Sequence, residues 1–260
     1  MAFVQVILSY GGGLTVIQIN LQSIQNIRDL GNTAMKDGRI IRPGCLIRSA
    51  HLGNAEQNDL NYLRKNARLN TVIDLRTVQE RYEVPDQTTG LIHENIPIFE
   101  TFQAGITHER KQDQPVIPDI SQIYRYMMKD KAAQSGFYRV LKYIFEHDYS
   151  KGSILWHCTE GKDRCGMVTA LVLTALGADR DTILADYLTT NETNRPKAEK
   201  VYEQLRKTQG EEAAQKAYQI YIADERYLQA AWEVMGDQYL EVELGFTINE
   251  LAMFREKVLY

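Results

Sequence analysis

The sequence has little cysteine and no long run of apolar residues. Its 260 residues include three cysteines, Cys45, Cys158 and Cys165, too few and too scattered for a disulfide framework, and the odd count is typical of a reducing compartment. No stretch reaches the roughly 18 apolar residues of a membrane span, and the N-terminus lacks a signal-peptide pattern. We therefore expect no stable membrane insertion and a cytoplasmic location, although secretion without a classical signal peptide is compatible with this sequence.

An excess of positive charge is also lacking. Lys and Arg number 30 against 34 Asp and Glu, which gives a net charge of −4. Such a chain has no general attraction to nucleic acid or to an anionic membrane, although a local basic site is possible. We expect no nucleic-acid partner, and the sequence does not indicate an oligomeric state. With 44% hydrophobic and 25% charged residues, the composition is ordinary for a globular protein with a full core.

Strand and helix patterns alternate along much of the chain. A hairpin is predicted from residues 3–9 and 14–19, and further strands at 45–48, 70–77, 91–98 and 152–157. Helices are predicted after Asn54 as N-cap, over most of 121–147, and up to Gly177 as C′ residue. From about residue 180 the pattern is almost wholly helical. The alternation predicts a three-layer α/β fold with a central, mainly parallel sheet flanked by helices, and a helical C-terminal part.

The segment ILWHCTEGKDRCGMVTALVL, residues 154–173, contains a short polar loop between two apolar stretches. The loop follows a predicted strand and precedes a predicted helix, where open α/β sheets usually bind ligands. Backbone N–H groups of a tight turn and a helix N-terminus both attract anions. A thiolate at Cys158 would be stabilised there. Arg164 offers a planar fork of donors that matches two phosphate oxygens.

These parts predict phosphoryl transfer to cysteine. Cys158 attacks phosphorus, the loop amides and Arg164 hold the equatorial oxygens, and a cysteinyl-phosphate is later hydrolysed. The predicted phosphate-binding residues are Thr159, Glu160, Gly161, Lys162, Asp163 and Arg164. Because the positive charge comes from Arg164 and the backbone, we expect no metal and no cofactor.

Five segments resemble one family in the same order along the chain. HCTEGKDRCG at 157–166 resembles the signature of the cysteine-dependent phosphatases, and in particular the HCxxGKDR(T/S)G loop of a bacterial branch, the mycobacterial phosphatase B-like tyrosine, dual-specificity and lipid phosphatases. The other four are NIRDLG at 26–31, IRPGCLIRSAHL at 41–52, VIDLRTVQE at 72–80 and ADYLTTN at 185–191.

This resemblance covers roughly residues 26–194. It implies a protein tyrosine phosphatase-like fold and one phosphatase domain over residues 1–260, with the hairpin at about 1–20 and the helical portion at about 180–260. It also implies a phosphomonoester hydrolase, most readily a protein tyrosine phosphatase with dual-specificity or phosphoinositide activity. The substrate would then be a phosphotyrosine protein or a phosphoinositide, and the sequence does not decide between them.

Several residues have roles that the resemblance leaves open. Asp163 is the first candidate for the general acid, which makes it the third predicted catalytic residue with Cys158 and Arg164. Other candidates lie in the long polar stretch that could act as a lid: Asp113, Asp119 and His108. Lys162 is either a substrate contact or a solvated lysine. His157 is expected to orient the loop by a hydrogen bond. Structural partners that could brace the loop are Asp74 with Arg76, and Asp29 with Arg28 and Arg48.

Cys165 departs from the family pattern, which has Thr or Ser at that position. In the family this hydroxyl is understood to donate to the nucleophile's sulfur, and a thiol is a weaker donor. The second half-reaction would then be slower. Alternatively, Cys165 is a resolving thiol for an oxidised Cys158, or simply a small residue that fills the same space.

Other protein classes fit the loop less well. A P-loop NTPase needs a Gly-x4-Gly-Lys-Ser/Thr frame, but Asp163 follows Lys162 here. Zinc binding through His157, Cys158 and Cys165 lacks a fourth ligand. A rhodanese-like sulfur carrier has no support elsewhere in the chain. The main alternative is a non-catalytic module that binds phosphorylated partners without turnover.

Overall fold

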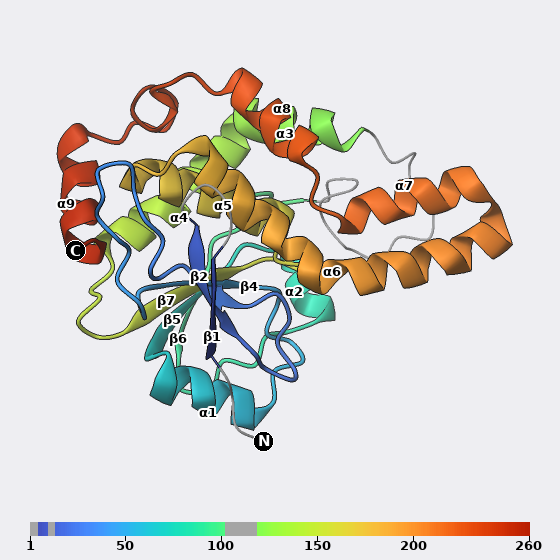
Figure 1. Ribbon diagram of the computed structural model, residues 1–260, viewed down its shortest axis with the longest axis horizontal. Coiled ribbons are helices and arrows are strands. Elements are labelled where there is room, and N and C mark those ends of the chain that lie inside the picture. The colour runs from blue at the N-terminus through green and yellow to red at the C-terminus, as the bar shows by residue number, and fades with distance from the viewer. Residues whose placement is uncertain (1–4, 10–13, 102–118) are drawn as a thin grey trace.

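A seven-stranded sheet runs through the protein in the computed structural model, which describes residues 5–9, 14–101 and 119–260 (Figure 1). The strands are β1 (Gln5–Ser9), β2 (Thr15–Ile19), β3 (Arg28–Asp29), β4 (Leu46–Ser49), β5 (Leu69–Asp74), β6 (Ile92–Asn95) and β7 (Ser153–His157). Their order is β1-β2-β3-β4-β7-β5-β6, with antiparallel pairs from β1 to β4 and parallel pairs from β4 to β6. β7 therefore lies between two parallel neighbours.

Helices cover both faces of the sheet. They are α1 (Gln57–Asn66), α2 (Val78–Glu83), α3 (Ile120–Lys129), α4 (Lys131–Glu146), α5 (Asp163–Leu176), α6 (Arg180–Gln209), α7 (Glu211–Tyr221), α8 (Glu225–Val234) and α9 (Ile248–Val258), with a π-helical turn, η2 (Tyr239–Glu243), before α9. In Figure 1, α1 lies on one side of the sheet and α4 and α5 on the other, while α6 and α7 project together to the right. The predicted three-layer α/β architecture with a helical C-terminal part is confirmed.

The core lies on the two faces of the sheet and fixes the position of β7. Along this strand Ile154 and Trp156 belong to the large cluster under α4 and α5, and Leu155 belongs to the smaller cluster under α1. Trp156 is fully buried and its ring N–H donates to Thr169 Oγ1 at 3.1 Å. Burial of each large apolar side chain contributes about 1.5–3 kcal/mol. The end of β7 is therefore held firmly.

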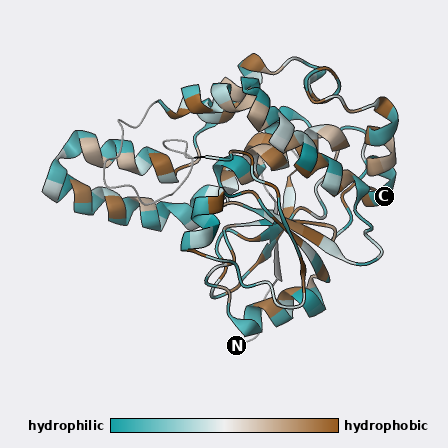
Figure 2. Ribbon diagram, turned by 180° about the vertical axis from the view of Figure 1, so that it is seen from behind, coloured by the Kyte–Doolittle hydropathy of each residue, from teal (hydrophilic) through white to brown (hydrophobic). Residues whose placement is uncertain are grey.

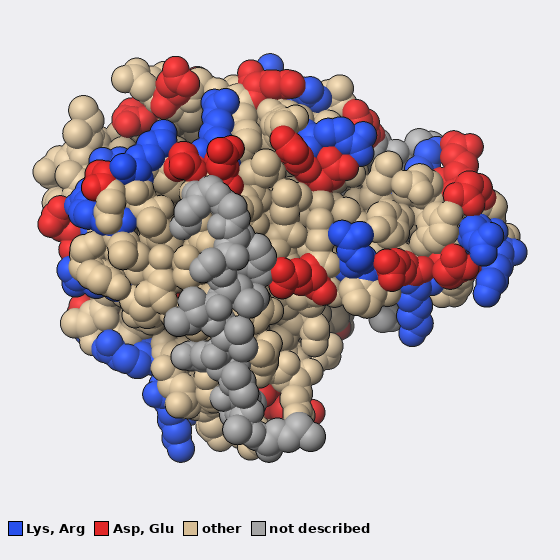
Figure 3. Space-filling view, viewed as in Figure 1, with Lys and Arg blue, Asp and Glu red and all other residues tan. Residues whose placement is uncertain are grey.

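The polar and charged residues are distributed over the surface as expected from the composition. Figure 2 shows hydrophobic residues on the central strands and hydrophilic residues over much of α1 and the far ends of α6 and α7. On the face drawn in Figure 3, Lys and Arg are interspersed with Asp and Glu instead of forming one basic patch. Within the described ranges, none of the helices is both long enough and apolar enough to cross a membrane.

Two predicted helices differ from those observed. The prediction of Asn54 as N-cap was wrong, because α1 begins at Gln57 and its N-cap is Glu56, whose N–H donates to Ser23 Oγ at 2.9 Å. A side chain from a distant loop thus takes the N–H of the N-cap residue, and no side chain caps this helix. The helix predicted over most of 121–147 is two helices, because the Asp130 side chain accepts from Ala133 N at 2.9 Å and starts α4.

The predicted end of the helix after the loop is confirmed. α5 ends at Gly177, which has a φ of +95° and whose N–H donates to the carbonyls of Leu173 and Thr174. This left-handed cap is the geometry that glycine adopts at low cost.

Candidate active site

The loop of residues 158–162 joins the end of β7 to the N-terminus of α5. Lys162 is the N-cap, so Asp163 and Arg164 lie in the first helical turn. Gly161 has a φ of +68°, and a Cβ added there would lie 2.6 Å from the carbonyl oxygen of Ser49. Only glycine fits this position, because of both its backbone conformation and its contact with the end of β4. The loop is therefore pressed tightly against the sheet.

A buried network holds the loop from the side of β3 and β4. Arg48 Nη2 donates to the carbonyl of Gly161 at 2.6 Å, and its Nη1 bonds Asp186 Oδ2. Arg28 Nε bonds Asp186 Oδ1 at 2.8 Å, and Arg28 Nη1 donates to Asn26 Oδ1 at 2.7 Å. The Asn26 amide in turn donates to Gly161 O at 3.1 Å. Burial alone would raise the pKa of Asp186, but the two arginines lower it.

This network corrects the expected role of Asp29. Arg28 and Arg48 do brace the loop, but their acidic partner is Asp186 of α6. Asp29 instead accepts from the backbone N–H groups of Gly31 at 2.9 Å and Gly44 at 2.6 Å. Successive side chains of a strand point to opposite faces, so Arg28 and Asp29 cannot reach the same partner.

Arg164 is held by a carboxylate from α2. Its Nη1 and Nη2 bond the two oxygens of Glu80 at 2.6 and 2.8 Å, and Thr159 Oγ1 donates to Glu80 Oε1 at 2.6 Å. Glu80 also forms a capping box with Thr77 at the start of α2. Burial would lower the pKa of Arg164, but the charge of Glu80 raises it. The guanidinium is thus charged and held in one plane, as two-point recognition of a phosphate requires.

We predict that Glu80→Gln lowers kcat/KM for an aryl phosphate by roughly 10- to 100-fold, because a small loss of alignment at a reacting centre can cost this much. An amide nitrogen cannot accept a hydrogen bond, so the fork of Arg164 loses one of its two partners. The matched control is Glu83→Gln, also on α2, which should keep kcat/KM. Unchanged or faster turnover in Glu80→Gln would show that Glu80 does not position Arg164.

Asp163 is buried and bonded on the side of α3. Its Oδ1 accepts from the Tyr124 hydroxyl at 2.7 Å, and Tyr124 in turn lies 2.7 Å from the Tyr187 hydroxyl. Burial and the nearby carboxylate raise the pKa of Tyr124 well above its ordinary value, so the phenol stays protonated and donates. Lys162 Nζ also lies 3.2 Å from Asp163 Oδ1. The role of Asp163 as general acid remains a prediction.

Charged side chains of the loop are bonded to the C-terminal helices. Lys162 is fully buried, and its ammonium donates to the carbonyl of Ile220 and, at 3.4 Å, to that of Ile222. Glu160 pairs with Lys197 of α6 at 2.5 Å. A direct contact between Lys162 and a substrate would require these bonds to the C-terminal end of α7 to break. That contact remains a prediction.

The other general-acid candidates are not brought to the loop by any described contact. Asp119 is the N-cap of α3, where its side chain accepts from Ser121 N at 3.0 Å. Asp113 and His108 lie outside the described residues.

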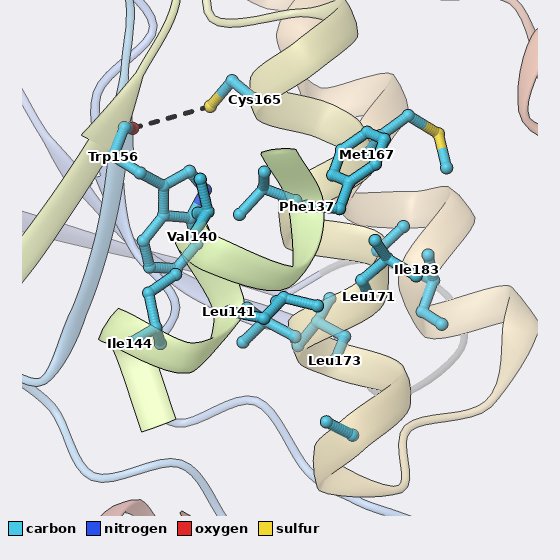
Figure 4. Close-up of a cluster of buried hydrophobic side chains, with 14 of the residues drawn as sticks. Phe137, Val140, Leu141, Ile144, Trp156, Cys165, Met167, Leu171, Leu173 and Ile183 are labelled. Carbon is cyan, nitrogen blue, oxygen red and sulfur yellow. Dashed lines mark hydrogen bonds between the residues drawn. The ribbon is translucent and has the colours of Figure 1, made fainter. Parts of the chain in front are cut away.

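The nucleophile candidate lies at the base of the loop. Cys158 is 3% exposed, and Cys165 is fully buried. The Cys165 thiol donates to the carbonyl of Trp156 at 3.6 Å (Figure 4). Burial raises the pKa of Cys165 to about 12, so at neutral pH it is a protonated thiol. A protonated thiol attacks an oxidised sulfur poorly, which weighs against Cys165 as a resolving thiol.

Alkylation should separate the three cysteines. Burial raises the pKa of Cys45 to about 11 and that of Cys165 to about 12. Because only thiolates react, fewer than about one in a thousand of either residue is reactive at pH 7.5. We predict that iodoacetamide at that pH labels Cys158 alone in the folded protein, as read by peptide mass spectrometry, with urea-unfolded protein as control. Faster labelling of Cys165 than of Cys158 would contradict this assignment.

His157 connects the loop to a buried group of charges. Its Nδ1 lies 3.1 Å from the carbonyl of Cys158, the contact expected of a residue that orients the loop backbone. Arg76 pairs with Asp74 at 2.8 Å and with Asp86 at 3.0 Å. His157 Nε2 lies 2.9 Å from Asp86 Oδ2. The expected pair of Asp74 and Arg76 thus forms beside the loop and includes Asp86.

Several residues that the structure brings to the site were missed in the sequence, among them Glu80, Asp186 and Tyr124. Glu80 and Asp186 stand inside two of the family-like segments, VIDLRTVQE and ADYLTTN, but nothing local indicates which residues they bond. The spacing from Thr77 to Glu80 does indicate a capping box. Tyr124 gives no signal, because an aromatic residue in an amphipathic helix is ordinarily part of the core.

Comparison with known proteins identifies the family. A family described as "Tyrosine phosphatase family" matches residues 19–260. A protein of Cupriavidus necator that is named as a tyrosine-protein phosphatase is 32% identical to this chain over 178 residues. The match covers 66% of this chain and 62% of that protein. The triple specificity protein phosphatase PtpB of Mycobacterium tuberculosis is 29% identical over 194 residues, 65% of this chain and 67% of that protein.

The match to the Cupriavidus protein thus spans somewhat less than two thirds of that protein's length. Among solved structures, the core catalytic domain of the PP-IP phosphatase SIW14 from S. cerevisiae is 14% identical with a TM-score of 0.34, covering 72% of this chain and 87% of that one. The match over residues 19–260 shows that the chain belongs to the tyrosine phosphatase family.

Proposed function

We propose that this protein hydrolyses phosphomonoesters through a cysteinyl-phosphate on Cys158, as a protein tyrosine phosphatase. One observation supports this above the others: Cys158 lies at a strand–loop–helix junction whose Arg164 is buried, charged and aligned by Glu80. Family membership points the same way. A non-catalytic binding module would have no need of a nucleophile beside the aligned guanidinium.

The proposed reaction has two steps. The Cys158 thiolate attacks phosphorus, the P–O bond to the leaving group breaks, and Asp163 gives that oxygen its proton. The N–H groups of residues 159–164 and the Arg164 fork hold the three equatorial oxygens. Water then attacks phosphorus and gives a proton back to Asp163 while the S–P bond breaks, which releases inorganic phosphate and the Cys158 thiolate.

The depth of Cys158 favours phosphotyrosine as the substrate. With its nucleophile only 3% exposed, the loop is reached more readily by a long aryl phosphate than by the shorter phosphoserine. The Mycobacterium relative is named a triple specificity protein phosphatase, so we include dual-specificity and phosphoinositide activity as the second candidate. We place this activity in one domain over residues 1–260 and in the cytoplasm.

Hydrolysis and trapping test this proposal. The protein should hydrolyse para-nitrophenyl phosphate with inhibition by vanadate, and acid quenching with a ³²P-labelled substrate should give a labelled peptide that contains Cys158. Parallel assays with phosphotyrosine peptides, phosphoserine peptides and phosphoinositides rank the substrates. Tight binding of a phosphopeptide without release of phosphate would establish the non-catalytic alternative instead.

A further inference from the structure

Four side chains that can bind a metal ion converge beside the loop. They are Asp74 at the end of β5, Asp86 after α2, His93 in β6 and His157 at the end of β7. One donor atom from each lies within 4.8 Å of the other three. The parallel pairing of β5 with β6 and β7 brings the three strand residues together. The side chains of Asp74, Asp86 and His157 are at most 1% exposed, and that of His93 is 25% exposed.

Three of the donor atoms are buried and have no partner in hydrogen-bond geometry: Asp86 Oδ2, His93 Nε2 and His157 Nε2. Their contacts with one another are ion-pair contacts, which are attractive only if a proton or another cation lies at the ring nitrogens. The other oxygen of Asp86 is fully occupied, since Oδ1 accepts from Leu52 N at 2.9 Å and lies 3.0 Å from Arg76. Buried polar atoms normally find partners, so three orphaned atoms that face one another need an explanation.

The tautomer of His157 shows why Nε2 and Asp86 Oδ2 need a positive partner. A carbonyl oxygen only accepts, so the contact of Nδ1 with Cys158 O places the proton on Nδ1. In a neutral ring Nε2 then turns a lone pair toward Asp86 Oδ2, 2.9 Å away. Two lone pairs at this distance repel, so a positive species must lie between or beside them, either a second ring proton or a metal ion. A ring that donates one N–H to a backbone carbonyl is typical of metal-binding histidines.

Charge and spacing both suit a metal ion. With both histidine rings neutral, the carboxylates of Asp74 and Asp86 face one positive charge on Arg76, which leaves one negative charge buried for a cation to balance. In a tetrahedral zinc site with bonds of about 2.0–2.1 Å, neighbouring donor atoms lie about 3.3 Å apart. Asp86 Oδ2 lies 2.9 Å from His157 Nε2 and 3.4 Å from His93 Nε2, close to that spacing.

We propose that His93, His157 and Asp86 form a binding site for a transition-metal ion, with Zn²⁺ preferred, and that Asp74, whose two oxygens also accept from Arg76, is the fourth donor. Two imidazoles and two carboxylates are a donor set that zinc favours. The ion would hold the His157 ring, and through it the backbone of Cys158, without touching phosphate. This site lies outside the proposed reaction and differs from the absence of metal that the sequence led us to expect.

The test uses full-length protein with Cys158→Ser, which removes the loop thiolate as a competing ligand. Titration calorimetry with Zn²⁺ should show one ion per chain, elemental analysis after desalting should recover it, and the melting temperature should rise. Adding His93→Gln should weaken binding by at least about tenfold, in line with losses on changing a metal's surroundings. Adding His147→Gln, a half-buried histidine of the α4 C-terminus, should leave binding unchanged.

His93 is the residue to change because, unlike Asp86, it does not also bond Leu52 and Arg76. The melting temperature of each variant without metal checks that it folds. If no stoichiometric zinc binds, or if His93→Gln binds zinc as well as its parent, the site is overturned. The second ring proton on His157 then explains the cluster, in keeping with the raised pKa of His157: burial lowers it, but Asp86 and Asp74 together raise it by more.

Discussion

Cys158→Ser is expected to lower kcat for an aryl phosphate by a factor on the order of 10⁴–10⁶, the loss seen when an enzyme's nucleophile is removed. A serine hydroxyl is not ionised at neutral pH and has no base assigned to it in the loop. The change is nearly isosteric at a buried position, so the melting temperature should change little. Steady-state assays give kcat, and calorimetry with inorganic phosphate should show that the Arg164 loop still binds the anion.

The matched control is Cys45→Ser, which changes another buried cysteine, just before β4 and away from the loop. It should keep kcat within a factor of about two, because surface and distant substitutions rarely alter a site. If Cys158→Ser kept a tenth of the parent's activity, or if Cys45→Ser lost as much, the nucleophile would have to be sought elsewhere.

Asp186→Ala is expected to lower the free energy of unfolding by about 3–5 kcal/mol, the usual cost of removing one partner from a buried ion pair. Arg28 and Arg48 would both keep their charge in the core without a counter-charge, and Arg48 would no longer be held against Gly161. Denaturant unfolding followed by circular dichroism measures the change, and kcat should fall with it.

Two further variants test whether the loss comes from the buried ion pairs of Asp186. Asp181→Ala, an exposed position in the first turn of α6, should change stability by less than about 0.5 kcal/mol. Asp186→Asn keeps the shape and removes the charge, so a loss close to that of alanine would assign the effect to electrostatics. A loss below about 1 kcal/mol in Asp186→Ala would contradict the proposed role of this ion pair.

The ion pairs of Asp186 with Arg28 and Arg48 also make the stability of the folded protein depend on pH. The two arginines hold the pKa of Asp186 below its ordinary value of 3.8, so the folded state binds this proton less readily than the unfolded chain does. The stabilisation is therefore complete above the ordinary value and is lost as the pH falls through the folded value. Parent and Asp186→Asn should differ most at neutral pH and converge in strong acid.

The fold class and the loop were predictable because their signals are local. Apolar periodicity placed most strands, and Cys158, Gly161 and Arg164 stand within seven consecutive residues. What holds the loop was not predictable, because each partner is distant in the chain. Glu80 lies 84 positions from Arg164, and Arg48 lies 138 positions from Asp186. No spacing in one sequence indicates pairs of that kind.

The predictions that were wrong failed for similar reasons, because distant residues or strand geometry decided the outcome. Asn54 had the expected capping pattern, but the helix begins three residues later, where Ser23 of another loop accepts from the N–H of the N-cap Glu56. The apolar pattern of 121–147 runs through Asp130, and periodicity alone does not show that this aspartate caps a second helix. Asp29 was grouped with Arg28 by proximity in sequence, whereas the alternation of a strand separates them.

Several residues that hold the loop lie far from it along the chain, so the site can form only after those residues have been synthesised. Lys162 is bonded to the carbonyls of Ile220 and Ile222, and Gly161 is held through Arg48 and Asp186. A growing chain that has left the ribosome only as far as α5 carries the whole signature motif but none of these downstream partners. We therefore expect phosphatase activity to appear late in synthesis and in one step, when the C-terminal helices have folded against the loop.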